Sequence, residues 1–515
     1  MKHILSRKAI LLPLILIVLQ STAQQTYYVK HDGNDALDGH TIATAWASPE
    51  KVDSTVFNAG DSILFEGGFS FRGMLTLPHA NSGTSSNPIV LSSYGGPMAT
   101  INGGDSLGLY VQNVAGMVVK KLIFTTSSPL TNATDGLSFF MDQATNLDYI
   151  LIDSVEVSGF GGNGITVGNG GAGGYSNVSI MHSLAHDNKG NAGISTYSNL
   201  NNFANTNIHV AYCKSYNNTG KPGGAPLTDA STGSGITIGG VTGATVEYCV
   251  AYNNGQNNNA INGGPVGIWT YESKNVIIQY CESYKNFAGS TVDGGGFDID
   301  GGTQNCIVQY CYSHGNEGAG FAFFQYNAPD IFSNNVIRYN ISENDGRKNN
   351  YGAISLWGYD GTHQITNSAV YNNTIYVDDV TLIINGVPEA VQLVSTNMTN
   401  IEIANNIFYV AGTLKLVNSP NPPPTTAGIL FQNNDYYAPS GFNIAWGATS
   451  ITDLNTWRTS PTSSGQEMNG GSPVGTTGNP LLTGPLGAGT IINPSYTANH
   501  LDSLSAYKIQ SGSAA

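Results

Sequence analysis

Short segments in which apolar and other residues alternate recur along the middle of the chain. They begin with a small residue followed by an apolar one, and they read GITV at Gly164, GIST at Gly193, GITI at Gly235, GIWT at Gly267, GFDI at Gly296, GFAF at Gly320 and AISL at Ala353. A period of two residues is typical of a β-strand with one face in the core. Each segment therefore predicts a short strand whose second residue points inward and whose third residue points outward.

A second repeat keeps step with the first. The segments NIHVAYCKSYNN, ATVEYCVAYNN, NVIIQYCESYKN, NCIVQYCYSHGN and NVIRYNISEND align at their centres without gaps. This alignment gives one equivalent position, occupied in successive units by Leu122, Ser154, Ser183, Cys213, Cys249, Cys281, Cys311, Asn340, Asn372 and Asn405. We read each unit as a short strand, a tight turn, a longer strand, a corner, another short strand and a loop of variable length.

A period near 30 residues, with several short strands and no intervening helix, predicts an all-β fold: a right-handed parallel β-helix of about ten coils. We assign residues 24–110 to an N-terminal cap and the first coils, and residues 111–412 to the repeats. Ser48 and Pro49 are suited to the N-cap and first residue of a capping helix. Residues 413–515 are expected to form a Pro-rich linker and an irregular C-terminal segment.

These repeats resemble the right-handed parallel β-helix superfamily of pectate lyases and polygalacturonases, the pectin-lyase-like fold, over roughly residues 100–410. The resemblance implies a secreted carbohydrate-active protein. Two departures leave the reaction open. No outward position of the marker strands is basic, as the base of a pectate lyase would be, and the polygalacturonase pattern of NTD, DD and GHG segments is not matched.

The N-terminus predicts export. Residues 1–23 have a basic start, an apolar run and small residues before Gln24, which is typical of a signal peptide cut after Ala23. We expect a secreted or periplasmic protein without a membrane span, because no other stretch approaches the roughly 20 apolar residues that a bilayer requires.

The charge narrows the range of partners. Removal of Lys2, Arg7 and Lys8 with the signal peptide leaves 16 basic against 34 acidic side chains, a formal charge of -18. This surplus argues against nucleic acid and anionic membranes as partners. We expect a monomer that binds a polysaccharide or oligosaccharide.

Four cysteines share one column, so neighbouring thiols could touch across coils about 4.8 Å apart. Because asparagines continue the column, we favour a buried stack of mostly free thiols, with disulfides as the alternative. Metal ligation is not expected, since no CxxC or Cys/His spacing occurs.

The candidate chemistry lies in DGGGFDIDGG, residues 293–302. Alternation places Phe297 and Ile299 in the core and Asp298 and Asp300 outside. Residues two apart on a strand are roughly 6.5–7 Å apart, a separation suited to an inverting glycosidase pair. The same pair with Asp293 could instead bind Ca²⁺, or the three carboxylates could be a solvated polar rung.

Aromatic side chains flank this rung and suit a sugar, whose C–H faces stack on rings while its hydroxyl groups bind acids. The predicted substrate-binding residues are Trp269, Tyr271, Phe324 and Trp357 on the strands, and Glu317, Arg347 and Lys348 on loops. Glu272 is a further candidate.

We therefore expect a secreted enzyme that cleaves polysaccharide, with glycoside hydrolysis by Asp298 and Asp300 favoured. A Ca²⁺-dependent lyase using the same aspartates and a non-catalytic carbohydrate-binding or adhesive β-helix remain as alternatives.

Overall fold

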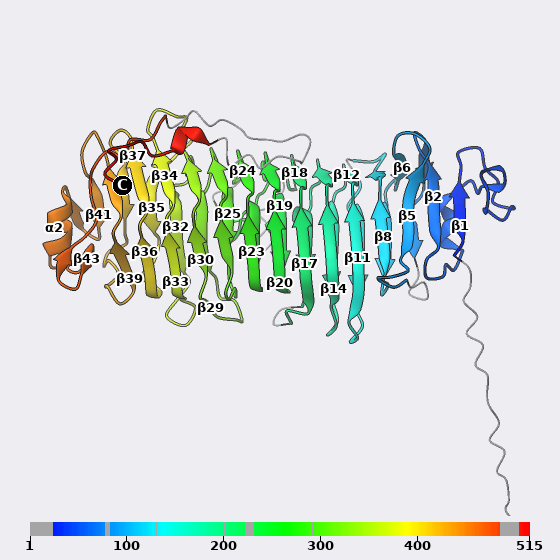
Figure 1. Ribbon diagram of the computed structural model, residues 1–515, viewed down its shortest axis with the longest axis horizontal. Helices are drawn as coiled ribbons and strands as arrows, with labels where there is room; N and C mark the ends of the chain where they lie inside the picture. The colour runs from blue at the N-terminus through cyan, green and yellow to red at the C-terminus, as the bar shows by residue number, and fades with distance from the viewer. Residues whose placement is uncertain are drawn as a thin grey trace, which may run out of the picture.

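The computed structural model describes residues 24–77, 83–129, 131–199, 202–221, 231–289, 292–484 and 504–515. The predicted signal peptide lies outside the described residues. The chain forms an elongated right-handed parallel β-helix of about twelve turns, slightly more than the ten expected from the sequence (Figure 1). The all-β prediction is confirmed.

Three parallel sheets run along the axis of this β-helix. Sheet 1 carries the marker strands and consists, in spatial order, of β4 (Leu75–Leu77), β7 (Leu109–Gln112), β10 (Leu137–Met141), β13 (Ile165–Asn169), β16 (Ala192–Tyr197), β19 (Ser234–Gly239), β22 (Val266–Tyr271), β25 (Gly295–Ile299), β28 (Phe321–Gln325), β32 (Gly352–Gly358), β35 (Glu389–Leu393), β38 (Lys415–Asn418), β41 (Ile444–Trp446) and β42 (Thr449–Ile451). All its pairings are parallel except the last, between β41 and β42.

Sheet 2 contains the longer strand of each unit. Its order is β1 (Thr26–Val29), β2 (Ser62–Glu66), β5 (Ile89–Tyr94), β8 (Met117–Lys120), β11 (Leu147–Asp153), β14 (Tyr175–Met181), β17 (Asn205–Ala211), β20 (Val241–Glu247), β23 (Lys274–Gln279), β26 (Ile307–Gln309), β30 (Val336–Arg338), β33 (Ile365–Tyr371), β36 (Met398–Ala404) and β39 (Ile429–Gln432), with β29 (Phe332–Ser333) beside β33.

Sheet 3 contains the short strand after the corner. Its order is β3 (Ser70–Arg72), β6 (Ala99–Asn102), β9 (Leu122–Thr125), β12 (Glu156–Ser158), β15 (Leu184–His186), β18 (Lys214–Tyr216), β21 (Val250–Tyr252), β24 (Glu282–Tyr284), β27 (Tyr312–His314), β31 (Ile341–Glu343), β34 (Thr374–Val377), β37 (Ile407–Val410) and β40 (Asp435–Tyr437). Strands β38 to β41 continue the three sheets beyond residue 412, where the sequence suggested a linker and an irregular segment.

The register of sheet 1 follows the alternation in the sequence. Residues Ile268, Phe297, Phe321 and Ile354 pair in successive strands, and all four are buried in the hydrophobic core. Every coil therefore contributes apolar side chains to one continuous core, and the intervening residues face away from it.

The column at the corner before sheet 3 is shifted by one residue in three coils. The pairings of β9, β12 and β15 place Leu122, Val155 and Ser183 at equivalent positions, so Val155 replaces the predicted Ser154. Likewise Asn373 and Asn406 replace the predicted Asn372 and Asn405. Ser154, Asn372 and Asn405 instead occupy the preceding turn with positive φ.

Asparagines continue this column as a buried hydrogen-bonded ladder. The side-chain oxygen of Asn340 accepts from the Cys311 backbone N–H at 2.9 Å, and Asn340 Nδ2 donates to Asn373 Oδ1 at 3.0 Å. All five cysteines lie in the described part of the chain, and each is buried with a free thiol.

A second buried ladder lies after sheet 3. Asn188, Asn218, Asn254, Asn286 and Asn316 each donate through Nδ2 to the side-chain oxygen of the next, and Asn316 donates to Asp345. These amides satisfy backbone and side-chain groups in a region that lacks strand pairing, and so fix the loops that lead into sheet 1.

The ends of the β-helix have their own elements. At the N-terminal end lie η1 (Ile42–Thr44) and α1 (Pro49–Asp53), and the Ser48 side chain caps α1 by accepting from the Lys51 N–H, as predicted. At the C-terminal end lie α2 (Leu454–Thr459) and the antiparallel pair β43 (Met468–Asn469) and β44 (Ser472–Pro473). No helix among the described residues is long and apolar enough to cross a membrane.

Residues 504–515 include a short segment that packs on the outside of sheet 3 (Figure 1). In η3 (Ser505–Tyr507), Tyr507 packs with Tyr376 of β34. Its hydroxyl donates to Glu343, which also accepts from Tyr312. Sheet 1 is the face that carries the predicted site.

Candidate active site

The outward column of sheet 1 brings the predicted aspartate and aromatic residues into register. Thr237, Trp269, Asp298, Ala322 and Ser355 are consecutive partners on β19, β22, β25, β28 and β32. Asp298 faces away from the core, yet only 3% of it is exposed. The strand pattern thus positions a single carboxyl beneath neighbouring side chains.

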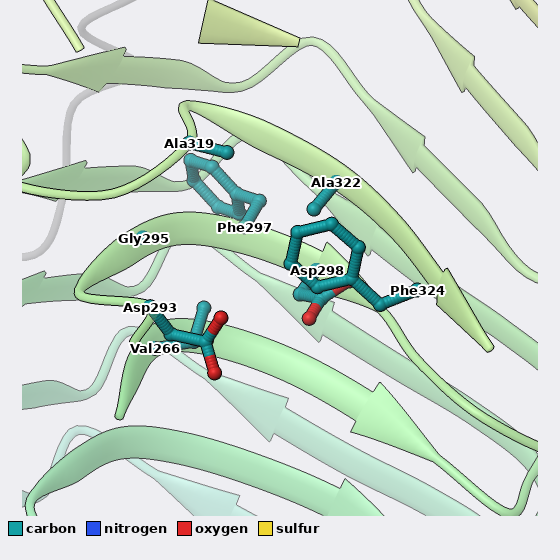
Figure 2. Close-up of a pocket in the computed structure, with 8 residues that line it drawn as sticks. All are labelled: Val266, Asp293, Gly295, Phe297, Asp298, Ala319, Ala322 and Phe324. Atoms are coloured by element: carbon teal, nitrogen blue, oxygen red, sulfur yellow. The ribbon is translucent and has the colours of Figure 1, made fainter. Parts of the chain in front are cut away.

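An open pocket of about 180 Å³ lies over this rung. Its lining residues are Val266, Asp293, Gly295, Phe297, Asp298, Ala319, Ala322 and Phe324. Figure 2 shows the Asp293 and Asp298 side chains at the pocket, with the Phe324 ring beside the Asp298 carboxyl. This volume includes open solvent above the rung, so the pocket is a hollow in the surface and does not enclose a ligand.

Asp298 is placed so that its neutral form is favoured. One carboxyl oxygen, Oδ1, is buried and has no hydrogen-bond partner among the described residues. Burial raises the pKa of Asp298 well above its ordinary value, and the charges of Asp300 and Asp293 raise it further. A buried, unpartnered carboxyl of this kind keeps its proton and can donate it.

Asp293 has a different environment in the same pocket. Its Oδ2 accepts from the Gly264 N–H at 2.7 Å, and its Oδ1 accepts from the Tyr351 hydroxyl at 3.1 Å. Burial raises the pKa of Asp293, and these two hydrogen bonds oppose that shift. Because both donors favour the ionised form, Asp293 carries a negative charge more readily than Asp298.

Asp300 lies two residues further along the chain and is not among the pocket-lining residues. It is half-buried and accepts from the Gly301 N–H at 2.7 Å. Burial raises the pKa of Asp300 to about 8, with the charges of Asp293 and Glu272 adding to the rise. The structure therefore gives Asp298 two acidic neighbours, of which Asp293 shares its pocket.

A second acidic group adjoins Asp300. Glu272 is 2% exposed, and its Oε1 accepts from the Tyr326 hydroxyl at 3.1 Å. Burial raises the pKa of Glu272 to about 7, and the charge of Asp330 raises it as well. Glu272 was a candidate from the sequence, whereas Asp330, Tyr326 and Tyr351 were not, because nothing in the local pattern links these loop residues to β25.

The predicted aromatic residues remain close to the rung. Trp269 and Tyr271 stack with ring centroids 5.1 Å apart, and Phe324 meets Trp357 edge to face at 6.4 Å. The Tyr271 ring lies over Gly239 in the preceding coil, where a Cβ atom would come within 2.3 Å of a ring carbon. Only glycine leaves room for this ring.

The three predicted loop residues are held in contacts with other parts of the protein. Lys348 Nζ lies 3.1 Å from Glu317 Oε2, which also accepts from the Ala288 N–H. Arg347 is 4% exposed and donates to the Asp378 carbonyl at 2.9 Å. None of the three lines the pocket.

The three aspartates do not converge on one point in the way a tight metal site requires. In the part of the chain that the structure describes, only His31, Asp32 and Glu66 bring three potential ligand atoms within 4.8 Å of one another. This group lies on the N-terminal coils and contains two exposed residues. Calcium binding by Asp293, Asp298 and Asp300 remains a proposal.

No protein-family model matches the sequence, and no curated protein matches it. Among solved structures, the native GH136 lacto-N-biosidase from Eubacterium ramulus aligns over 74% of this chain and 68% of its own, at 18% identity and a TM-score of 0.54. The two proteins share the β-helix fold. At this identity the likeness shows the fold alone.

Two further solved structures align with lower TM-scores. A mannuronic acid specific polysaccharide family 6 lyase from human gut microbiota has a TM-score of 0.44 at 15% identity, covering 81% of this chain and 86% of that one. Pectate lyase Pel9A has a TM-score of 0.36 at 15% identity, covering 78% and 80%.

Proposed function

We propose that this protein hydrolyses glycosidic bonds in a polysaccharide or oligosaccharide bound across sheet 1. The observation that carries the proposal is a pair of carboxyls in one pocket that differ in hydrogen bonding. Asp298 has a buried oxygen without a partner among the described residues, whereas Asp293 accepts two hydrogen bonds. Two carboxyls whose surroundings push their pKa values apart are what a glycoside hydrolase uses.

In the proposed reaction Asp298 donates its proton to the glycosidic oxygen as the bond to the anomeric carbon breaks. Asp293 takes a proton from the water that attacks this carbon, so one water is consumed per bond cleaved. The sequence alone suggested Asp300 as the partner of Asp298. The shared pocket favours Asp293, and Asp300 then acts through its charge on Asp298.

Lyase chemistry receives less support from the arrangement of basic groups. β-Elimination needs a base that removes a proton next to a carboxylate, and the basic candidates Arg347 and Lys348 are engaged with Asp378 and Glu317. Calcium-assisted elimination therefore stays an alternative that the experiment below separates from hydrolysis.

In the second part of the proposal, aromatic side chains bind the sugar. Trp269 and Tyr271 on β22, Phe324 on β28 and Trp357 on β32 lie around the pocket and present apolar surface to the C–H faces of sugars. A glycan along the axis would cross several coils. The N-terminal segment supports action outside the cytoplasm.

The test is a panel of polysaccharides incubated with purified protein, with and without chelator. New reducing ends without ultraviolet-absorbing unsaturated products, unchanged by chelator, are the expected result. Unsaturated products that require Ca²⁺ would select the lyase. Binding without any cleavage across the panel would select the carbohydrate-binding alternative.

A further inference from the structure

We propose that the site is selective for a neutral glycan and disfavours polymers of uronic acids. This inference rests on the proposed function and specifies the substrate class of the same site. It follows from two observations. Acidic side chains gather around β25, and the basic side chains Lys348 and Arg347 are bound to other residues of the protein.

Acidic groups gather on one part of sheet 1 and its loops. Asp293 and Asp298 line the pocket, and Asp300 comes directly after β25. Glu272, directly after β22, and Asp330, after β28, extend the group across neighbouring coils. In addition to burial, the negative charges of Asp300 and Asp293 raise the pKa of Asp298. In the same way, the charges of Asp293 and Glu272 raise the pKa of Asp300, and the charge of Asp330 raises the pKa of Glu272.

No basic side chain lines the pocket. The outward column from β13 to β35 is likewise without a basic residue, and it reads Thr166, Ser195, Thr237, Trp269, Asp298, Ala322, Ser355 and Gln392. The two basic residues that were predicted to bind substrate are bound to other groups, Lys348 to Glu317 and Arg347 to Asp378. A ligand carboxylate would therefore find no cation among the described residues that line this pocket.

The cost of an anionic ligand follows from Coulomb repulsion. A uronate placed beside Asp293 repels its charge and makes ionisation of the neighbouring acids harder still. The negative formal charge of the whole chain, -15, also lowers the local concentration of polyanions. A neutral sugar avoids both penalties.

The remaining surface of the pocket suits an uncharged ligand. Val266, Ala322 and Phe324 contribute apolar walls. A neutral sugar can rest on these walls without leaving a charge of its own unpaired.

The experiment compares matched substrates that differ only in charge. Polygalacturonate and alginate are tested beside their carboxyl-reduced neutral forms, together with neutral galactan, xylan, mannan and glucan. Binding is measured with Asp298→Asn by affinity electrophoresis, and cleavage is measured with the wild type. We expect the neutral glycans to bind at least about tenfold more tightly than the uronate polymers. Cleavage is expected only for the neutral glycans.

A charge variant tests the cause. Glu272→Gln keeps an acceptor for Tyr326 and removes a carboxyl whose pKa is raised by burial to about 7. Measured above about pH 8, where Glu272 is ionised, the variant should reduce the discrimination against uronates severalfold. Glu402→Gln, which removes an exposed charge on β36 of sheet 2, should leave it unchanged.

The outcomes separate this inference from the proposed function. Preferred binding of uronates without added cation, or only with Ca²⁺, would overturn the inference while leaving a catalytic role for Asp298 intact. Neutral glycans bound but never cleaved would uphold the charge preference and refute hydrolysis. Absence of binding to every member would refute both.

Discussion

The hydroxyl of Tyr351 makes two hydrogen bonds to one residue, Asp293. It accepts from the Asp293 backbone N–H at 2.9 Å and donates to the Asp293 carboxylate at 3.1 Å. Asp293 itself has a positive φ of 53°, an uncommon conformation for a residue other than glycine. A residue 58 positions away along the chain therefore fixes both the backbone and the carboxylate of the proposed base.

Tyr351→Phe should weaken the proposed base without removing it. Loss of the donated hydrogen bond raises the pKa of Asp293, so the ascending limb of the pH–activity profile should move to higher pH and activity at neutral pH should fall by about tenfold. Loss of two hydrogen bonds should also lower the free energy of unfolding by about 1–3 kcal/mol. Tyr359→Phe, at a half-exposed site beside Trp357, is the control, and an unchanged pH profile in Tyr351→Phe would contradict the role of Asp293.

Asp300→Asn distinguishes the two possible partners of Asp298. If Asp300 acts only through its charge, the variant should retain activity within about tenfold. The descending limb of its pH–activity profile should shift to lower pH, because the charge of Asp300 is the largest electrostatic cause of the raised pKa of Asp298. A loss of about 10²-fold or more would instead identify Asp300 as a catalytic acid or base.

Stability should depend on pH through the same carboxyl. The pKa of Asp300 is raised to about 8 in the folded protein, against an ordinary value of 3.8. Between these values the folded protein binds a proton that the unfolded chain has lost, so the free energy of unfolding should fall as the pH rises from about 4 to 8.

Asp300→Asn keeps an acceptor for the Gly301 N–H and removes this titration, so the decline should be smaller in the variant. Urea denaturation at several pH values measures the difference, with Asp105→Asn at an exposed site as control. Equal pH dependence in the wild type and Asp300→Asn would show that Asp300 ionises normally.

The buried amide ladder should be a main contributor to stability. Asn286 Nδ2 donates to Asn316 Oδ1 and Ser283 Oγ, and its Oδ1 accepts from Asn254. Asn286→Ala leaves buried partners unsatisfied and should lower the free energy of unfolding by about 2–4 kcal/mol. Asn257→Ala, at an exposed site, should change it by less than about 0.5 kcal/mol, and a similar small effect at Asn286 would contradict this account.

The fold was predictable because both repeats report the same period. The residue that fills the column before sheet 3 was harder to predict where two asparagines are adjacent, as at residues 372–373 and 405–406. Asparagine suits a turn with positive φ and also a buried ladder, so the sequence did not show which of the two filled the column. The column continues at Asn434, whose side-chain oxygen accepts from Asn406. This position lies beyond residue 412, where the repeats were expected to end, so about ten turns were expected instead of about twelve.

The site was predictable only along the strand. Alternation placed Asp298 outward and Phe297 inward, which the pairing of β25 bears out. The contact between Tyr351 and Asp293 depends on how loops of different length meet, and no local pattern encodes it. Lys348 and Glu317, predicted for the substrate groove, pair with each other for the same reason.

The most direct test of the central claim is the activity of Asp298→Asn on a glycan that the wild type cleaves. Asparagine has nearly the same shape but cannot donate the proton, so reducing-end release should fall by at least about 10²-fold. Thermal stability should be unchanged or higher, because the variant removes a buried carboxyl from the neighbourhood of Asp293 and Asp300. Wild-type activity in Asp298→Asn would contradict its role as the proton donor and would place the catalytic groups elsewhere.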